Sequence, residues 1–502
     1  MRAVEIIKPF SNNGVSFEQG HRYVMAENDE ANMRTLYGEN MGMSYPIDNI
    51  YREYKGQDLN GKKLLVFRTG GIGDLHWPIP VFKYLKNKYP NCFIRAASAC
   101  KQPLENCPWI DELYDMPFDA KLLEESDYAR MFQGIIEGES EASKKTHAVD
   151  MFFSYFGIDS IQFPDEEKRP KLFFTKTEME WRDKELKRMN ITDDIYFIGI
   201  QMETSAPIRN FPKEKFKAVI DALAKEENTK IALIGLPIHD VIASFYKGHY
   251  PNVLIWTKYT VRQTMVMATR YNLVISPDSF MVQTAGALEK PLIGIYGPFP
   301  SEVRMKYFKN AIGLDTDVVC SPCYHHDYRP CIKGNPSPCW SLIKVEDVLQ
   351  AADYLKFKFT GQHFNYMANF LRMPDLAEVE KYMMSADKGI CFFSGYYRHP
   401  NVTTVDTNPF VKADITNLST DFKRSYYPFV LFMNDFTPKN KSVYDGAKGM
   451  VRPGGYFIVY RCESNEQLYS EIQKDVGNSF VIIYSKFNPT DRTFVIAGKK
   501  TY

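Results

Sequence analysis

The first clear hydrophobic pattern in the chain begins at Lys62. An apolar run (KLLVF) is followed by a turn with three glycines (RTGGIGD), a stretch with helical periodicity (PIPVFKYLKNKY) and a second apolar run (CFIRAAS). This succession is typical of a strand, a loop, a helix and a second strand. Consecutive parallel strands need such a crossover helix, so we predict a domain with a parallel sheet over residues 61–188.

The same alternation returns near Tyr196. Its apolar runs are IYFIGIQ, KIALIGL, VLIWT, NLVISPD and PLIGIYG, and helical segments lie between them. We therefore predict a second doubly wound domain over residues 189–360. The charged helical stretch TKTEMEWRDKELKRM connects the two domains, and the cleft between two such domains is the default position of a ligand.

Two further segments flank this pair of domains. Residues 1–60 are polar and aromatic and show no long periodic segment, which predicts a small N-terminal extension. Residues 365–502 contain the runs GICFFS, NVTTVD, FVLFMND, YFIVYR, SFVIIYS and TFVIAGK, which predict a third Rossmann-like domain. The predicted fold class is α/β, with two Rossmann-like doubly wound domains that face a cleft and a third at the C-terminal end.

Composition and charge narrow the class of protein further. The 502 residues are 44% hydrophobic, which is enough to bury several cores. The 62 Lys and Arg residues nearly balance the 61 Asp and Glu residues, so no overall field draws the protein to nucleic acid or to an anionic membrane. Neither an N-terminal apolar segment nor a run long enough to span a bilayer is found, so we expect a cytoplasmic protein without a membrane span.

The glycine-containing turn carries the first candidate chemistry. Gly70, Gly71 and Gly73 allow the backbone to approach a ligand closely, and the helix that follows presents free amides to a phosphate or sugar oxygen. A sugar hydroxyl that attacks an anomeric carbon must lose its proton, and a carboxylate at the position of Asp74 can accept it. The alternative is an ordinary strand-to-helix turn in which Asp74 caps the helix.

A second motif ends a strand of the second domain. The sequence SPDS is followed by the small-residue stretch QTAGA and then by KPLIGIYGP. A helix that begins at Asp278 and Ser279 would aim its amides at a diphosphate. The alternative is again that these two side chains only cap the helix.

Taken in order, these motifs resemble one known family. The succession of RTGGIGD, Arg209-Asn210-Phe211-Pro212, SPDS, a small-residue helix and KPLIGIYGP looks like the ADP-heptose:lipopolysaccharide heptosyltransferase family, glycosyltransferase family 9. The resemblance covers about Lys62 to Lys356. It implies a GT-B fold and inverting sugar transfer without a catalytic metal, with Asp74 as the general base.

The resemblance also implies which residues hold a nucleotide-diphosphate sugar. The predicted cofactor-binding residues are Gly70, Gly71, Gly73, Arg209, Asp278, Ser279 and Gln283. The chain departs from the family pattern, because Phe280 and Gln283 stand where the family usually has Gly and His. Gly235-Leu236-Pro237 also supplies no acidic residue where the family has one that contacts the donor nucleoside. We expect a donor that is ADP- or UDP-linked. The identity of its sugar stays open.

Four of the nine cysteines are clustered. The spacing Cys320-x2-Cys323-x7-Cys331-x7-Cys339 can close a tetrahedral site, so we predict a structural zinc or iron ion. The alternative is a set of reduced thiols packed under a loop. Some members of the family that this chain resembles carry such a four-cysteine finger, including a dodecameric branch that modifies bacterial proteins. The resemblance to that branch implies that this protein could form a homo-oligomer.

The C-terminal domain resembles a class I methyltransferase. The resemblance rests on Val405-Asp406, Ala413-Asp414-Ile415, FVLFMND and the turn Arg452-Pro453-Gly454-Gly455. Only SGYYRHPNVT lies between its first two expected strands, which is too short for a cofactor loop and a crossover helix. We predict a non-catalytic domain that binds an acceptor or takes part in assembly.

Three functions remain open at this stage. The first is a glycosyltransferase that acts on lipopolysaccharide or another surface glycan. The second is a bacteriophage DNA glycosyltransferase for hydroxymethylcytosine or hydroxymethyluracil, since the N-terminal segment faintly resembles short phage modules. Such an enzyme would act in an infected host and would need a flipped base or an exposed hydroxymethyl group near Asp74. The third is a non-catalytic scaffold, which the joint presence of Asp74, Arg209 and Asp278 disfavours.

Overall fold

The structure of the protein is a computed structural model. It describes residues 1–12, 15–136, 144–316, 318–323, 331–334, 337–362, 364–365, 389–392, 402–405, 427–433, 451–461, 466–478, 481–488 and 493–499. The chain divides into two compact units. Unit 1 comprises Met1–Phe211, Asn228–Gly313 and Ser321–Ile332, and unit 2 comprises Pro212–Glu227, Leu314–Cys320 and Lys333–Tyr502. The whole predicted catalytic and donor-binding set lies in unit 1.

Unit 1 begins with a small antiparallel sheet, in the order β5-β1-β4-β9. Its elements are β1 (Arg2–Ile6), β4 (Arg22–Met25), β5 (Met41–Pro46) and β9 (Phe118–Asp119), with the hairpin of β2 (Phe10–Asn12) and β3 (Val15–Phe17) and the helix α1 (Glu27–Tyr37) beside it. The last strand comes from far along the chain: Tyr23 pairs with Asp119 and Val24 with Phe118. The N-terminal segment is therefore completed by a strand from beyond residue 60. The domain boundaries themselves stay predictions.

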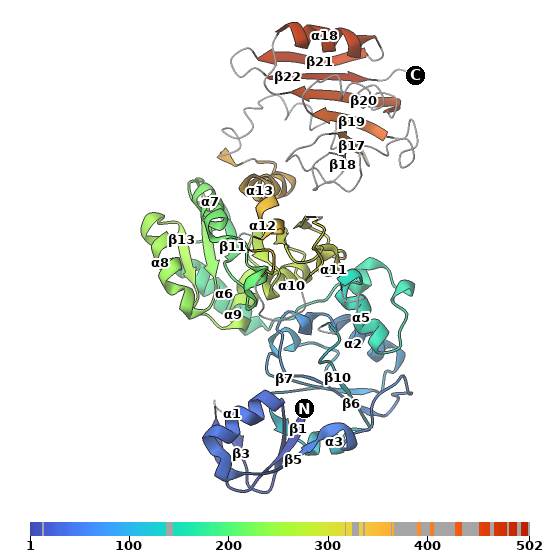
Figure 1. The fold of residues 1–502 in the computed structure, drawn as a ribbon, viewed down its shortest axis with the longest axis vertical. Coiled ribbons are helices and arrows are strands. Elements are labelled where there is room, and N and C mark those ends of the chain that lie inside the picture. Colours follow the sequence, from blue (N-terminus) through green and yellow to red (C-terminus); the bar gives the residue numbers. More distant parts are fainter. Residues whose placement is uncertain are drawn as a thin grey trace. The chain divides into compact units, whose positions relative to one another are not determined.

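A parallel sheet follows in the order β10-β6-β7-β8. Its elements are β6 (Lys63–Arg68), β7 (Phe93–Ser98), β8 (Glu112–Tyr114) and β10 (Tyr128–Met131), and α2 (Ile79–Lys88) is the crossover between β6 and β7. From Leu64 onward β6 is buried, as an apolar run with both faces covered must be. The predicted strand, glycine turn, helix and strand are confirmed (Figure 1).

The second parallel sheet has the order β13-β12-β11-β14-β15-β16. Its strands are β11 (Tyr196–Gln201), β12 (Thr229–Ile234), β13 (Val253–Trp256), β14 (Leu273–Pro277), β15 (Leu292–Ile295) and β16 (Ala311–Leu314), and the helices of unit 1 after them are α8 (Asp240–His249), α9 (Val261–Ala268) and α10 (Phe280–Ala287). Helix α8 lies beside β13 (Figure 1). The strand order reverses between β11 and β14, and ligands of open α/β sheets bind at the carboxyl ends of the strands at such a point.

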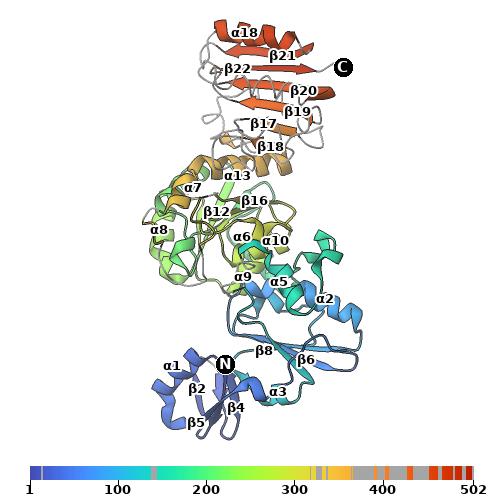
Figure 2. The ribbon, with the colours of Figure 1, turned by 45° about the vertical axis from the view of Figure 1, so that its right-hand side comes forward.

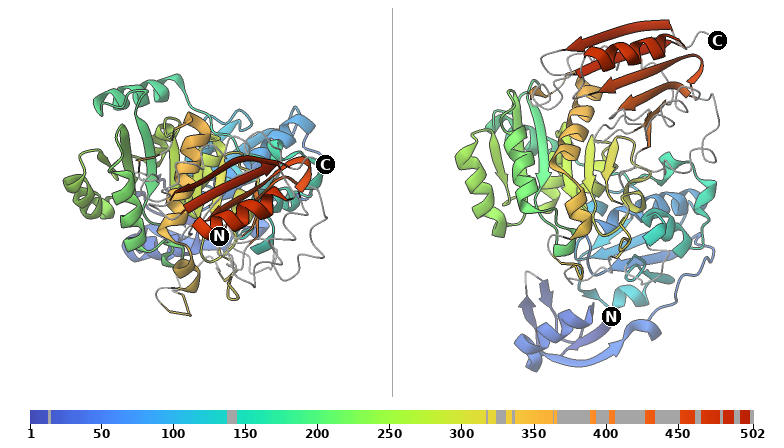
Figure 3. Two further views of the ribbon diagram at one scale, coloured as in Figure 1. Left: turned by 90° about the horizontal axis from the view of Figure 1, so that it is seen from above. Right: turned by 45° about the horizontal axis from the view of Figure 1, so that its top comes forward.

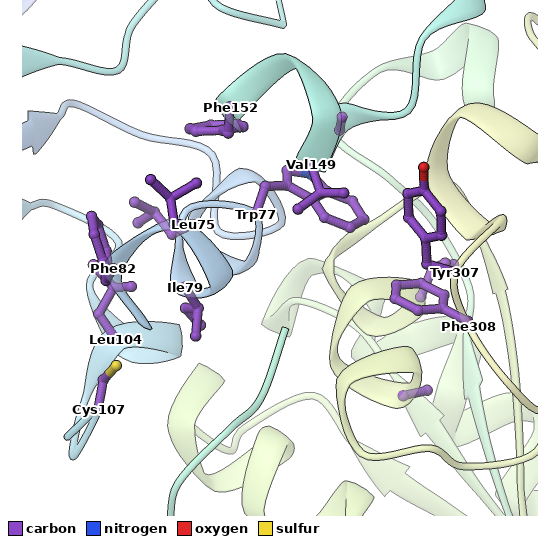
Figure 4. Close-up of a cluster of buried hydrophobic side chains, with 14 of the residues drawn as sticks. Leu75, Trp77, Ile79, Phe82, Leu104, Cys107, Val149, Phe152, Tyr307 and Phe308 are labelled. Atoms are coloured by element: carbon purple, nitrogen blue, oxygen red, sulfur yellow. The ribbon is translucent and has the colours of Figure 1, made fainter. Parts of the chain in front are cut away.

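Aromatic side chains join the loops of the two parallel sheets. The ring of Trp77 stacks on that of Phe308, with centroids 6.0 Å apart and an interplanar angle of 13°. Figure 4 shows Trp77 between Val149 on one side and the rings of Tyr307 and Phe308 on the other. All four belong to one buried cluster that continues through both sheets, so unit 1 has a shared apolar core.

A buried arginine adds a polar link within the same unit. Arg262 of α9 donates from Nη1 to the carbonyl oxygen of Gln102 at 2.9 Å and from Nε to Oε1 of Glu178 at 2.5 Å. Glu178 belongs to α6 (Lys176–Arg188), the charged connector that the sequence predicts. The guanidinium therefore ties the connector and a loop of the first sheet to the second sheet.

Unit 2 contains α7 (Lys213–Leu223), α12 (Pro338–Leu342), α13 (Val345–Thr360) and a C-terminal sheet in the order β18-β17-β19-β20-β22-β21. The elements of that sheet are β17 (Gly389–Phe392), β18 (Val402–Val405), β19 (Tyr427–Met433), β20 (Val451–Arg461), β21 (Val481–Asn488) and β22 (Thr493–Lys499), with helix α18 (Glu466–Gly477). The six predicted strands are thus confirmed. Strands β17 to β20 are parallel, and β22 is antiparallel to its two neighbours.

Helix α18 lies along β21 in this sheet (Figures 2 and 3). Its residues Ile472 and Val476 are one turn apart and are buried, as is Ile496 of β22. Strands β17 and β18 pair in parallel although only residues 393–401 connect them. Asp406 and the segment 413–415, on which the methyltransferase resemblance partly rests, lie outside the described residues. The non-catalytic role of this domain stays a prediction.

No helix within the described ranges is both long enough and apolar enough to cross a membrane.

Candidate functional site

The glycine loop starts from a buried arginine. Arg68, the last residue of β6, is 1% exposed, and its guanidinium donates to the carbonyl oxygen of Gly70 at 2.5 Å and to that of Phe132 at 2.8 Å. It also donates from Nη2 to Oδ2 of Asp74 at 2.5 Å. The guanidinium of Arg68 therefore holds the loop together by donating to backbone and carboxylate oxygens.

Gly71 must be a glycine for two reasons. Its φ is +83°, in the left-handed region that side chains disfavour, and a Cβ atom at this position would collide with Oδ2 of Asp74. The close approach of backbone and carboxylate is thus built into the loop.

Asp74 is the first residue of the short helix η3 (Asp74–His76), and Gly73 occupies its N-cap without a side-chain capping bond. The structure therefore does not support helix capping as the role of Asp74. Its side chain is 27% exposed, in contrast to the buried Arg68 with which it forms an ion pair. The carboxylate is accessible and is oriented by a cation behind it.

His76 is a site residue that was not predicted from the sequence. It is fully buried, with Nδ1 3.0 Å from the carbonyl oxygen of Gly73 and Nε2 3.2 Å from Oγ1 of Thr284 in α10. Burial lowers the pKa of His76 to about 4, against the opposing effect of its bonds to backbone carbonyls. The ring is neutral near pH 7, so Nδ1 donates to the carbonyl and Nε2 accepts from the Thr284 hydroxyl. No local signal in the sequence distinguishes this histidine from a surface one.

Arg209 and Asp278 form the polar pair at the second motif. Nη1 of Arg209 lies 3.0 Å from the carbonyl oxygen of Asp278 and 3.1 Å from its Oδ2, and Nη2 donates to Oγ of Ser205 at 3.0 Å. Asp278 is 6% exposed. The predicted cation and carboxylate are therefore brought together, and each is partly neutralised by the other.

Ser279 occupies the N-cap of α10 but makes no side-chain capping bond. Its Oγ instead accepts a hydrogen bond of 2.6 Å from Nε2 of Gln201, the last residue of β11. The capping alternative is thus wrong for Ser279. Gln201 is a second residue that the sequence analysis missed, although a polar residue at the end of an apolar strand was a usable signal.

The two motifs meet at the first turn of α10. A Cβ atom built on Gly73 would lie 3.6 Å from Cγ of Gln283 and 3.7 Å from Cα of Phe280. Gln283 is 3% exposed, and its Oε1 has no hydrogen-bond partner in the part of the chain that the structure describes. The glycine loop therefore packs directly against the helix end that carries Ser279.

The four clustered cysteines are divided between the two units. Cys320 and Cys339 belong to unit 2, whereas Cys323 and Cys331 belong to unit 1. Residues 324–330, which include both neighbouring histidines, are outside the described residues, and among those described no three His, Cys, Asp or Glu side chains are grouped to hold a metal ion. The residues as described do not form a metal site, and the metal ion stays a prediction.

A glycine loop with an accessible carboxylate, packed on a helix start at a strand-order reversal, is the kind of arrangement in which α/β enzymes bind phosphorylated ligands. Residues 136–331 match the family described as Glycosyltransferase family 9 (heptosyltransferase). Over these residues the chain is similar to glycosyltransferase family 9 enzymes. The match contains Arg209, Asp278, Ser279 and Gln283 but begins after Asp74.

Several solved structures match this chain at low identity. A glycosyl transferase family 9 protein from Veillonella parvula DSM 2008 is 17% identical, with 61% of this chain and 99% of that one covered and a TM-score of 0.47. The ADP-heptose lps heptosyltransferase II of E. coli is 14% identical, with 59% and 99% covered and a TM-score of 0.45. The iron-containing dodecameric glycosyltransferase TibC of enterotoxigenic E. coli H10407 is 13% identical, with 60% and 80% covered and a TM-score of 0.45.

The methyltransferase similarity is weaker. The CurJ carbon methyltransferase is 11% identical, with 23% of this chain and 49% of that one covered and a TM-score of 0.18. The comparison with curated proteins found no match. The similarity to glycosyltransferase family 9 accordingly rests on the sequence match over residues 136–331.

Proposed function

We propose that the protein transfers a sugar from a nucleotide-diphosphate donor to an acceptor hydroxyl with inversion at the anomeric carbon, on a GT-B arrangement of its two parallel sheets. One observation carries this proposal: the loop that holds Asp74 packs at Gly73 against the first turn of α10. A candidate base and a candidate phosphate-binding helix end are thereby neighbours, which is what sugar transfer from a diphosphate requires.

The donor side is the N-terminal end of α10. Its free backbone N–H groups and the positive end of the helix dipole stabilise the negative charge that develops on the leaving diphosphate. Ser279 adds a hydroxyl at this end, and Arg209 adds a cation whose charge is shared with Asp278. These groups therefore serve binding and leaving-group stabilisation together.

The acceptor side is the carboxylate of Asp74. As the acceptor oxygen forms a bond to the anomeric carbon, the bond from that carbon to the diphosphate oxygen breaks, and the acceptor proton passes to Asp74. The diphosphate leaves with the bonding electron pair. Attack from the face opposite to the leaving group inverts the configuration. Arg68 orients the carboxylate through Oδ2.

The acceptor is proposed to be lipopolysaccharide or another surface glycan, since the family is that of heptosyltransferases. The donor is proposed to be ADP- or UDP-linked. The TibC structures are described as iron-containing, and one of them as a complex with ADP-D-beta-D-heptose. For this chain a metal ion at the four cysteines would be structural, and no step of the transfer is assigned to it.

The experiment that tests this function is a donor panel. ADP-, UDP- and GDP-linked sugars are titrated into the protein, and affinity is measured by calorimetry with thermal shift as a second readout. We expect one nucleotide class to bind, and to bind more weakly to Ser279→Ala and Arg209→Ala. Product formation is then measured with a glycan acceptor and with DNA that contains hydroxymethylcytosine. Transfer to DNA alone would replace the glycan by the phage alternative, and no binding to any donor would contradict the function.

A further inference from the structure

Gln201 ends β11 at the reversal of strand order, and the site residues predicted from the sequence do not include it. It is 6% exposed, and its side chain reaches across to the start of α10. We propose that Gln201 is a positioning residue that presents the hydroxyl of Ser279 as a hydrogen-bond donor to a phosphate oxygen of the sugar donor. This inference rests on the proposed function and adds a residue to its phosphate site.

The orientation of the Gln201 amide is fixed by a backbone carbonyl. Nε2 donates to the carbonyl oxygen of Glu203 at 2.9 Å, and a carbonyl oxygen only accepts. The atom that faces Glu203 must therefore be the nitrogen. Its second hydrogen is directed to Oγ of Ser279 at 2.6 Å.

This bond decides what the Ser279 hydroxyl can do. Because Oγ accepts from Gln201, the hydroxyl proton is free to point elsewhere. It has no described acceptor, since the Ser279 side chain makes no capping bond and its only hydrogen bond within the described ranges is the one from Gln201. Ser279 is partly exposed at a helix N-terminus, where an anion is favoured. The arrangement is that of a donor group prepared for a phosphate oxygen.

A second observation points to a ligand at the same place. Oε1 of Gln201 and Oε1 of Gln283 are buried and have no hydrogen-bond partner among the described residues. A buried carbonyl oxygen without a partner destabilises the fold unless a ligand or a water molecule donates to it. Gln201 bonds to Ser279, the N-cap of α10, and Gln283 lies one helical turn further along, so both unsatisfied side chains belong to the start of α10.

The competing explanation is that Gln201 only holds the backbone after β11 through Glu203. A double-mutant cycle separates the two roles, because it measures whether Gln201 acts through Ser279. The variants are Gln201→Met, which removes both amide donors at similar volume, Ser279→Ala, and the double variant. The probes are ADP and UDP, with inorganic pyrophosphate as a third, and dissociation constants are measured by calorimetry.

We expect Gln201→Met and Ser279→Ala each to weaken nucleotide binding by about tenfold, as the loss of one hydrogen bond to a charged group does. The double variant should bind no more weakly than Ser279→Ala alone. The control is Gln263→Met, since Gln263 accepts from the backbone N–H of Thr260 at the start of α9 in the same unit. It should lower the unfolding temperature and leave nucleotide affinity unchanged.

Two results would overturn the inference. Additive losses in the double variant would show that Gln201 acts independently of Ser279, and unchanged affinity in Gln201→Met would show that it does not act on the phosphate site. Both presuppose that the wild-type protein binds a nucleotide. If none of the three probes binds the wild type, the proposed function fails and this inference fails with it.

Discussion

The guanidinium of Arg68 and the carboxylate of Asp74 form an ion pair, with Nη2 2.5 Å from Oδ2, in which the cation is buried and the anion is 27% exposed. The other donors of Arg68 reach the carbonyl oxygens of Gly70 and Phe132. Three acceptors in different directions hold the guanidinium in place. The position of the proposed base therefore depends on an arginine at the end of the preceding strand.

Replacing Arg68 by Lys should lower the rate of sugar transfer by roughly ten- to a hundredfold, because an ammonium group cannot reach all three acceptors in the planar geometry of Arg and a small displacement of a base is costly. The measurement is kcat with saturating donor. Donor affinity should stay within about twofold. A rate equal to that of the wild type would show that Asp74 does not need Arg68.

Gly71→Ala should lower both stability and transfer rate, because Gly71 has a φ of +83° and a Cβ would strike Asp74. Gly61→Ala is the matched control, since Gly61 has a φ of +68° and open space around it. Both variants should lose about 1 kcal/mol of unfolding free energy through backbone strain. Only Gly71→Ala should also lose activity. Equal activities in the two variants would refute a role for the close approach to Asp74.

His76 gives a prediction for pH dependence. Its pKa in the fold is about 4, against an ordinary value of 6.5, so the unfolded state binds a proton more readily between these values. Stability that is fully present above about pH 6.5 is therefore lost as the pH falls toward 4, by at most about 3 kcal/mol. Urea unfolding of the wild type and of His76→Gln between pH 4 and pH 6.5 measures this loss of unfolding free energy. The difference between the two profiles should shrink at low pH, and parallel profiles would contradict the assignment.

Gly286 of α10 packs against the ring of Phe308, and a Cβ there would overlap it. Gly286→Ala should destabilise the protein by about 1–3 kcal/mol, since a well-packed core does not admit an extra methyl group. Gly248 of α8 has open space, so Gly248→Ala should be neutral or stabilise by up to about 1 kcal/mol. Urea midpoints of both variants measure the contrast. Similar shifts in the same direction would exclude the contact with Phe308 as the cause.

The four-cysteine prediction is tested by elemental analysis of the purified protein. We expect about one zinc or iron ion per chain, lost together with thermal stability in the double variant Cys323→Ser and Cys331→Ser. The control is Cys92→Ser, because Cys92 is buried in the first parallel sheet's core, remote from the cluster in sequence. It should keep its metal. A metal-free wild type would leave reduced thiols as the correct interpretation.

Local patterns were enough to predict the elements that carry the site. The apolar run of β6 followed by glycines, and that of β14 followed by Asp278 and Ser279, each stand out within a few residues, because strand burial and turn chemistry are local properties. The two parallel sheets and the six C-terminal strands followed from the same reasoning.

The pairings within the site could not be predicted in this way. His76 meets Thr284 across 208 residues of sequence, and Gln201 meets Ser279 across 78. Such contacts depend on the order of strands in the sheet, on which the periodicity of one segment carries no information. The two-residue strand β9 is too short to show any period, so its place in the N-terminal sheet was also missed.

The most direct test of the central claim compares the wild type with Asp74→Asn, which keeps the shape of the side chain and an oxygen for Arg68 but cannot accept a proton. The measurement is the single-turnover rate of sugar transfer, with the dissociation constant of the donor determined on the same samples. The account predicts that Asp74→Asn transfers the sugar about a hundredfold more slowly than the wild type or slower still, while its donor affinity stays within about twofold. A rate close to that of the wild type would contradict Asp74 as the base.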